Sequence, residues 1–198
     1  MPDSTSHTVV AVVLRVRDGE LESLRSGVDR RRGESLEAAL GRAVDVAALA
    51  HHEQLETLLL RGGALATAYL GLIPADRRLD GDWHPLDRGT DTLVAAAAAR
   101  LRAKLSYTNV GFALAPAVFT ISELREIYVA ALGHDVSATN LQRVLVRRGV
   151  LDRVEGVRAP GRAGGRPAAL FRFASAQLEV TDQFAVLAPR RPGSRASG

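Results

Sequence analysis

Residues 120–173 constrain the fold of this 198-residue chain more than any other stretch, because they combine two capped helices with two apolar strands. Thr120 and Glu123 have the spacing of a capping box, in which each residue satisfies a backbone N–H at the start of a helix. Ser137 is placed to cap a second helix, which ends at Gly149. Only a few residues separate the two helices, so we expect them to form a helix-turn-helix unit.

A hairpin is predicted directly after the second helix. Residues 150–154 and 168–173 are rich in strand-forming residues, and the intervening residues 158–167 form a glycine-rich basic loop. Helix, turn, helix and hairpin in this order predict a winged helix-turn-helix with the loop as its wing. The arginines of this loop are Arg158, Arg162 and Arg166.

The second helix is divided by face, with apolar residues on one side and Asn140, Arg143 and Arg147 on the other. Arginine pairs with guanine and asparagine with adenine in the major groove of DNA. We therefore predict contacts with double-stranded DNA from this face, with Thr139 and Arg148 near the DNA backbone. The wing arginines would follow the phosphates. The alternative is an ordinary solvated helix face.

Positive charge is concentrated in the C-terminal half. Residues 1–100 hold 12 lysines and arginines against 15 acidic residues, whereas residues 101–198 hold 14 against 7. Such an asymmetry is typical of a module that binds a polyanion. The chain has no cysteine, no apolar run of membrane-spanning length and no leader-like N-terminal segment, so we expect a cytoplasmic protein without disulfides and without a membrane partner.

The N-terminal half predicts a mixed α and β domain. Residues 9–16 and 64–73 are predicted as strands, and a helix should open at residues 33–37, with Leu36, Val44 and Ala47 on its apolar face. We expect residues 75–89 to form a loop and residues 91–105 to form an alanine-rich helix.

The segment from Gly33 to Arg42 resembles the middle of a Nudix box, a pattern of glutamates that holds divalent cations. Glu34 matches the first glutamate of that pattern and Arg42 matches its arginine. The next glutamate positions hold alanine and valine, which cannot bind a hard cation. These positions are Ala43, Val46 and Ala47, and the outer glycines are replaced by Val28 and Leu49. The resemblance therefore implies a degenerate box with no metal and no catalytic residue.

The two halves together resemble the Nudix-related transcriptional regulators of NAD metabolism. The residues that carry the resemblance lie in segments 101–108, 112–116, 119–124 and 165–173. It implies an α+β chain in which a Nudix-like α/β/α sandwich precedes a winged helix-turn-helix. It also implies a homodimeric repressor of NAD biosynthesis or salvage genes, with ADP-ribose or a related NAD metabolite as effector and no cofactor. The expected divisions are 1–90 (sensor and dimerisation), 91–108 (connecting helix), 109–188 (DNA-binding domain) and 189–198 (disordered tail).

Two stretches are shorter than in that family. No Leu-Pro-Gly-Gly-like segment precedes the box, and residues 51–58 run almost directly into residues 62–64. Both differences fall where loops would line the ligand cleft. Either the cleft is reduced, or loop residues are missing from this sequence.

Two other functions compete with DNA-binding regulation. One is a Nudix hydrolase acting on ADP-ribose or other nucleoside diphosphate derivatives, against which the missing glutamates argue. The other is a scaffold that binds RNA or a protein, and the low aromatic content of 5% argues against stacking on single-stranded bases. Lys104, the only lysine, ends the connecting helix and is predicted to contact phosphate or an acidic neighbour. Acetylation would then remove its charge and weaken DNA binding; the alternative is a solvated lysine.

Overall fold

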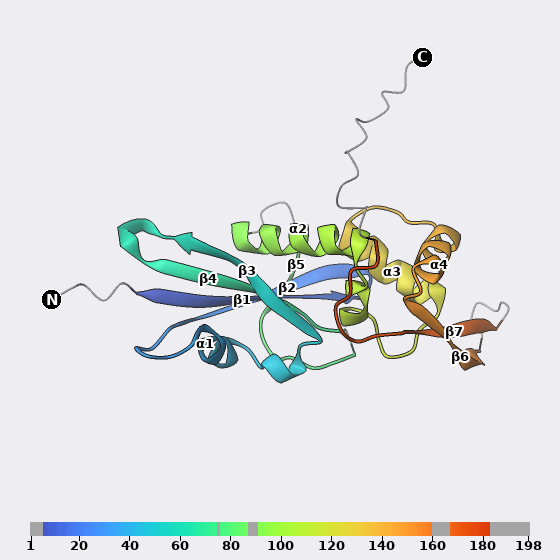
Figure 1. Ribbon diagram of the computed structural model, residues 1–198, viewed down its shortest axis with the longest axis horizontal. Helices are drawn as coiled ribbons and strands as arrows, with labels where there is room; N and C mark the ends of the chain where they lie inside the picture. Colours follow the sequence, from blue (N-terminus) through green and yellow to red (C-terminus); the bar gives the residue numbers. More distant parts are fainter. Residues whose placement is uncertain (1–5, 75, 87–90, 160–166, 183–198) are drawn as a thin grey trace, which may run out of the picture.

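The computed structural model describes residues 6–74, 76–86, 91–159 and 167–182. A five-stranded mixed sheet occupies the N-terminal half, with strand order β3-β4-β1-β2-β5 (Figure 1). β1 and β4 are parallel, and the other neighbouring strands are antiparallel. The strands are β1 (His7–Arg17), β2 (Glu20–Asp29), β3 (His51–Leu59), β4 (Leu65–Leu72) and β5 (Trp83–Pro85).

One helix covers each face of this sheet, giving the predicted α/β/α sandwich. Helix α1 (Leu36–Ala43) lies on one face and α2 (Thr92–Tyr107) on the other (Figure 1). Alternate residues of β1 therefore enter two different cores. Val9 packs in the cluster that contains α1, whereas Val12 packs in the cluster that contains α2. Burial on both faces explains why β1 is an uninterrupted apolar run.

The C-terminal half forms the predicted winged helix-turn-helix. Both hydrogen bonds of the capping box between Thr120 and Glu123 are present, and Gly133 ends the first helix in the left-handed conformation. Ser137 caps the second helix through the backbone N–H of Asn140. The elements are α3 (Ile121–Leu132), α4 (Ala138–Arg147), β6 (Leu151–Arg158) and β7 (Ala168–Phe173), preceded by a 3-10 helix at Val110–Ala113.

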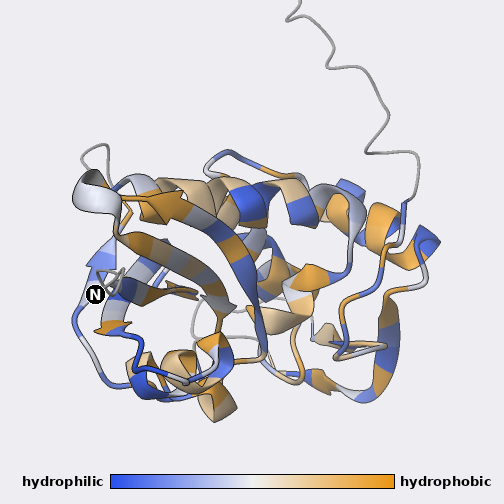
Figure 2. Cartoon of the chain, turned by 60° about the vertical axis from the view of Figure 1, so that its left-hand side comes forward, coloured by the Kyte–Doolittle hydropathy of each residue, from blue (hydrophilic) through white to orange (hydrophobic). Residues whose placement is uncertain are grey.

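A single apolar cluster joins the sheet to the winged helix. It runs from Val12 and Leu70 in the sheet through Leu101 of α2 to Phe119 and Leu124. Figure 2 shows hydrophobic residues along the central strands and along helices beside them. The winged helix lies at one end of the sheet (Figure 1), so displacement between the two halves would expose part of this cluster.

Several sequence-based predictions for the N-terminal half were wrong or incomplete. β2 and β3 were not predicted, and β5 lies inside the predicted loop 75–89, where it pairs with β2. Helix α1 ends at Ala43, because Val44 adopts an extended conformation and Asp45 caps a separate 3-10 helix that contains Ala47. The short connection after residue 58 is a β3–β4 hairpin turn through the 3-10 helix Arg61–Gly63.

No helix among the described residues is long and apolar enough to cross a membrane. The predicted connecting segment 91–108 contains α2. The predicted disordered tail, 189–198, lies outside the described residues.

Candidate nucleic-acid interface and the degenerate box

Helix α4 presents a mostly polar, exposed face opposite a buried one. Leu141 and Leu145 are buried in the domain core, opposite this face. The sequence-based prediction named four of the exposed residues and missed Gln142 and Val146. Helical spacing from Thr139 would have found both, since they lie three and seven residues further along. The exposed residues of α4 are Thr139, Asn140, Gln142, Arg143, Val146 and Arg147.

Two of the predicted base contacts are bonded to each other. The Nη2 of Arg143 donates to the Oδ1 of Asn140 at 2.8 Å. This bond occupies one acceptor of the asparagine and leaves its NH₂ group available as a donor. Asn140 and Arg143 therefore form one unit, and a change at either position alters the orientation of the other.

Arg148 lies inside the domain, not on the exposed face. Its Nη2 donates to the carbonyl oxygen of Ser106 at 2.7 Å and lies 3.4 Å from the carboxylate of Asp182. Only 13% of its side chain is exposed. The predicted phosphate contact would require these bonds to open, so the structure assigns Arg148 a bracing role between α4 and the end of α2.

Of the three predicted wing arginines, Arg158 lies within the described residues. The Nη1 of Arg158 pairs with the Glu123 carboxylate at the start of α3, and its Nη2 donates to the carbonyl oxygen of Val118 at 3.5 Å. This arginine thus ties the end of β6 to the start of α3. Arg162 and Arg166 lie outside the described residues.

Lys104 contacts an acidic neighbour, which is one of the two predicted contacts. Its Nζ lies 2.7 Å from the Oε2 of Glu53 on β3, and the residue is 9% exposed. Arg100 and His51 also approach this carboxylate, at 3.4 and 3.5 Å. The cluster joins β3 to α2, and the His51 ring meets Phe112 edge-on. The predicted phosphate contact and the solvated alternative do not fit this burial.

Burial and the neighbouring charges shift the pKa of Glu53 in opposite directions. Burial alone would raise the pKa of Glu53, but the hydrogen bond from Lys104 and the charges of Lys104, His51 and Arg100 hold that pKa below its usual value. Burial also lowers the pKa of His51 below its usual value. The cluster therefore pairs an ionised Glu53 with Lys104 at the boundary between sheet and helix.

The two remaining residues of the Nudix-like box, Glu34 and Arg42, form an ion pair with each other. Arg42 donates to both carboxylate oxygens of Glu34, at 2.8 and 2.9 Å, and to the carbonyl oxygen of Asp29 at 2.7 Å. These bonds and the backbone N–H of Arg31 lower the pKa of Glu34 to about 2. No group of three or more metal-binding side chains is present among the described residues. The glutamate is thus engaged in a structural ion pair.

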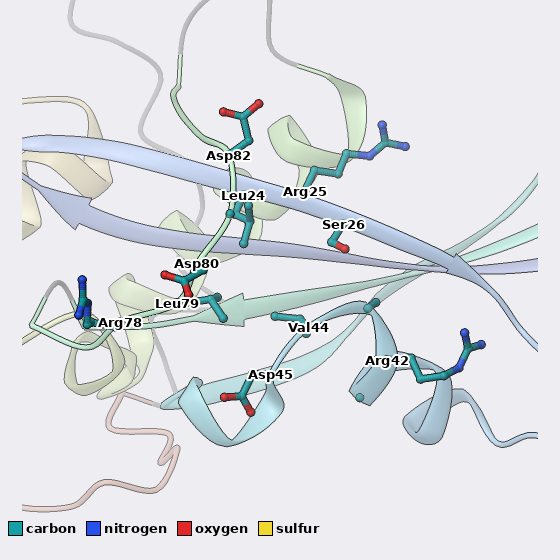
Figure 3. A pocket seen from close by; sticks show the side chains of 13 residues that line it. Leu24, Arg25, Ser26, Arg42, Val44, Asp45, Arg78, Leu79, Asp80 and Asp82 are labelled. Atoms are coloured by element: carbon teal, nitrogen blue, oxygen red, sulfur yellow. The ribbon is translucent and has the colours of Figure 1, made fainter.

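A pocket of about 700 Å³ opens beside the end of α1. Leu24, Val44 and Leu79 line it together with side chains of both charges (Figure 3). In that view Arg25 and Arg42 lie towards one end and Asp45, Arg78 and Asp80 towards the other. An apolar wall with polar groups of both signs suits a ligand that has an apolar ring and charged or hydroxyl substituents.

Comparison with known proteins agrees with this geometry. Residues 111–173 match the family model described as the NrtR DNA-binding winged helix domain. The structure of Shewanella oneidensis NrtR in complex with a 27mer DNA superposes with a TM-score of 0.64 at 25% identity, covering 84% of this chain and 92% of that one. The chain is thus similar to NrtR regulators, and the family match lies in the winged helix.

Two further comparisons extend this relationship. The ADPR responsive transcriptional repressor NtrR of Acinetobacter baylyi is 38% identical over 82 residues, which span 41% of this chain and about a third (32%) of that protein's length. A MutT/nudix family protein from Enterococcus faecalis superposes with a TM-score of 0.64 at 17% identity, covering 88% of this chain and 90% of that one. This likeness shows the fold alone; the winged helix match comes from the family model.

Proposed function

We propose that this chain is a DNA-binding transcriptional repressor that inserts α4 into the major groove of an operator. The observation that carries the proposal is the exposed face of α4, which presents Asn140, Arg143 and Arg147 opposite a fully apolar one. The match to the NrtR winged helix and the likeness to a protein solved on DNA support it. The basic C-terminal half supplies the charge that a phosphate backbone attracts.

The N-terminal sandwich is proposed to bind a small nucleotide effector without hydrolysing it. The pocket beside α1 is the candidate site, and its apolar and charged lining suits ADP-ribose or a related NAD metabolite. Responsiveness of the Acinetobacter repressor to ADPR supports this choice. The glutamates that would hold catalytic cations are replaced by alanine and valine, so we propose no hydrolase activity. The target genes are proposed to be those of NAD biosynthesis or salvage.

A homodimer in the cytoplasm is part of the same proposal. An NrtR-type winged helix that recognises a two-fold operator needs two copies of α4 about one helical turn apart. The apolar cluster shared by the sheet, α2 and the winged helix provides a stiff connection that sets this spacing. An effector in the sandwich would change DNA affinity only if it binds one arrangement of the dimer more tightly than the other.

The proposal is tested by measuring binding to DNA duplexes that the protein selects from a random library. Arg143→Ala should weaken binding to the selected duplex by about 1–3 kcal/mol and relax its sequence preference. Arg32→Ala, which changes an exposed arginine far along the chain from α4, is the control and should bind like the native protein. Unchanged affinity of a folded Arg143→Ala protein would rule out this role for α4. Preference for single-stranded RNA over duplex DNA would favour the scaffold hypothesis instead.

The effector is tested separately by adding ADP-ribose to the DNA complex. Replacing Arg78, an exposed arginine at the pocket, by alanine should weaken any response to ADP-ribose while leaving DNA affinity without effector unchanged. An identical response in the variant would exclude this pocket as the effector site, and absence of any response would exclude ADP-ribose.

A further inference from the structure

Three exposed side chains form one row along α4, on the side opposite the buried leucines. Thr139, Arg143 and Val146 stand at positions i, i+4 and i+7, which fall on one side of a helix. Leu141 and Leu145, both buried, lie opposite this row. A partner that approaches this side of α4 would therefore contact these three side chains.

Val146 is unusual in this position because it is apolar. It is 49% exposed, although its neighbours on the face, Gln142, Arg143 and Arg147, are polar or charged. A single exposed valine needs no explanation on an ordinary surface. On the line that would enter the groove it matters, because a branched side chain has a restricted χ1 angle and so holds its methyl groups in fixed positions.

Among the groups that base edges present in the major groove, the apolar one is the C5 methyl of thymine. A valine pressed against any other base edge would remove that edge from water without replacing its hydrogen bonds, which is unfavourable. Contact with a thymine methyl removes two apolar surfaces from water together and is favourable. The chemistry of the row thus fits a thymine beside a guanine contacted by Arg143.

We propose that Val146 is a specificity-determining residue that contacts the C5 methyl of a thymine in each half-site; the inference rests on the proposed DNA-binding function. Three residues of helix separate Arg143 from Val146, a rise of about 4.5 Å. Base pairs are stacked about 3.4 Å apart. The thymine therefore lies one or two base pairs from the guanine of Arg143. Thr139, at the other end of the row, carries a second methyl group on the opposite side of Arg143.

The experiment uses the full-length protein and a duplex that it has selected from a random library. Each thymine is replaced in turn by uracil, which lacks only the C5 methyl group. At one thymine per half-site, the native protein should bind the uracil duplex about fourfold more weakly, the loss expected for one buried CH₂-sized group. Val146→Ala should bind the thymine and uracil duplexes equally at that position. Alanine is the better helix former, so this variant should fold.

Leu59→Ala is the matched control. Leu59 is 75% exposed at the β3–β4 hairpin, at the opposite end of the molecule from α4 (Figure 1), and its loss should leave the preference for thymine unchanged. If Val146→Ala retains that preference, or if uracil weakens binding at no position, the inference is wrong while the proposed function stands. If the native protein selects no duplex, both fail together.

Discussion

The pair formed by Lys104 and Glu53 gives the sharpest test of how the sheet is held to α2. Lys104→Gln removes the positive charge at 2.7 Å from a carboxylate that is only 20% exposed. Breaking a fully buried pair by removing one partner costs about 3–5 kcal/mol, because the remaining charge stays desolvated. Arg100 still lies 3.4 Å from Glu53, and part of the site is open. We therefore expect the free energy of unfolding to fall by about 2 kcal/mol.

The assay is chemical denaturation at pH 7, with two companion variants. Lys104→Arg keeps the charge and should lose little stability. Glu53→Gln combined with Lys104→Gln should be more stable than the sum of the single changes predicts, because no charge is then left unpaired. Additive effects in this cycle would show that the pair is not coupled, and equal stability of Lys104→Gln and Lys104→Arg would refute the argument outright.

The pH dependence of the same variant has a definite sign. The pKa of Glu53 is depressed in the folded native protein, so its contribution is present above the unfolded value of 4.5 and is lost as the pH falls through the folded value. Without Lys104, the hydrogen bond and the charge that most oppose the effect of burial are lost, so the pKa of Glu53 rises and the glutamate takes up a proton more easily. The destabilisation caused by Lys104→Gln should therefore shrink between pH 7 and pH 4. A penalty that is constant over this range would contradict the electrostatic explanation.

Three further predictions concern other parts of the fold. The ion pair of Glu34 with Arg42 stabilises the native protein above the unfolded pKa of Glu34, 4.5, and this contribution is lost as the pH falls to the folded pKa of about 2. Glu34→Gln should lack this pH-dependent contribution, and identical acid unfolding curves of the two proteins would contradict the ion pair. Gly111→Ala should lower the free energy of unfolding by about 2 kcal/mol, since its Cβ would stand 2.6 Å from the buried Tyr128 hydroxyl, whereas the unobstructed Gly41→Ala should not destabilise the protein. Assays with magnesium or manganese should show no hydrolysis of ADP-ribose or NADH above the control without enzyme; turnover that disappears in Glu34→Gln would overturn the inactive box.

The sequence by itself determined the elements whose signals are local. Thr120, Glu123, Ser137 and Gly133 act on backbone groups within four residues of themselves, so the ends of α3 and α4 could be placed without any tertiary information. The two faces of α4 follow equally from a period of 3.6 residues. The loss of the metal-binding glutamates from the box can also be recognised from the sequence alone, because alanine and valine have no oxygen ligand in any fold.

Tertiary structure decided whatever depends on partners distant in the sequence. β2 and β3 are polar stretches without a strong strand pattern, and they are strands because β1 and β4 offer them backbone hydrogen bonds. The partners of Arg148 and Lys104 were decided in the same way. Arg148 was expected near the DNA backbone, and Lys104 near phosphate or an acidic neighbour. Inside the fold they bond to Ser106 and Glu53, which are 42 and 51 residues away in the chain. Tertiary packing decides which acceptor lies within hydrogen-bond distance of a charged side chain. No local sequence pattern encodes that proximity.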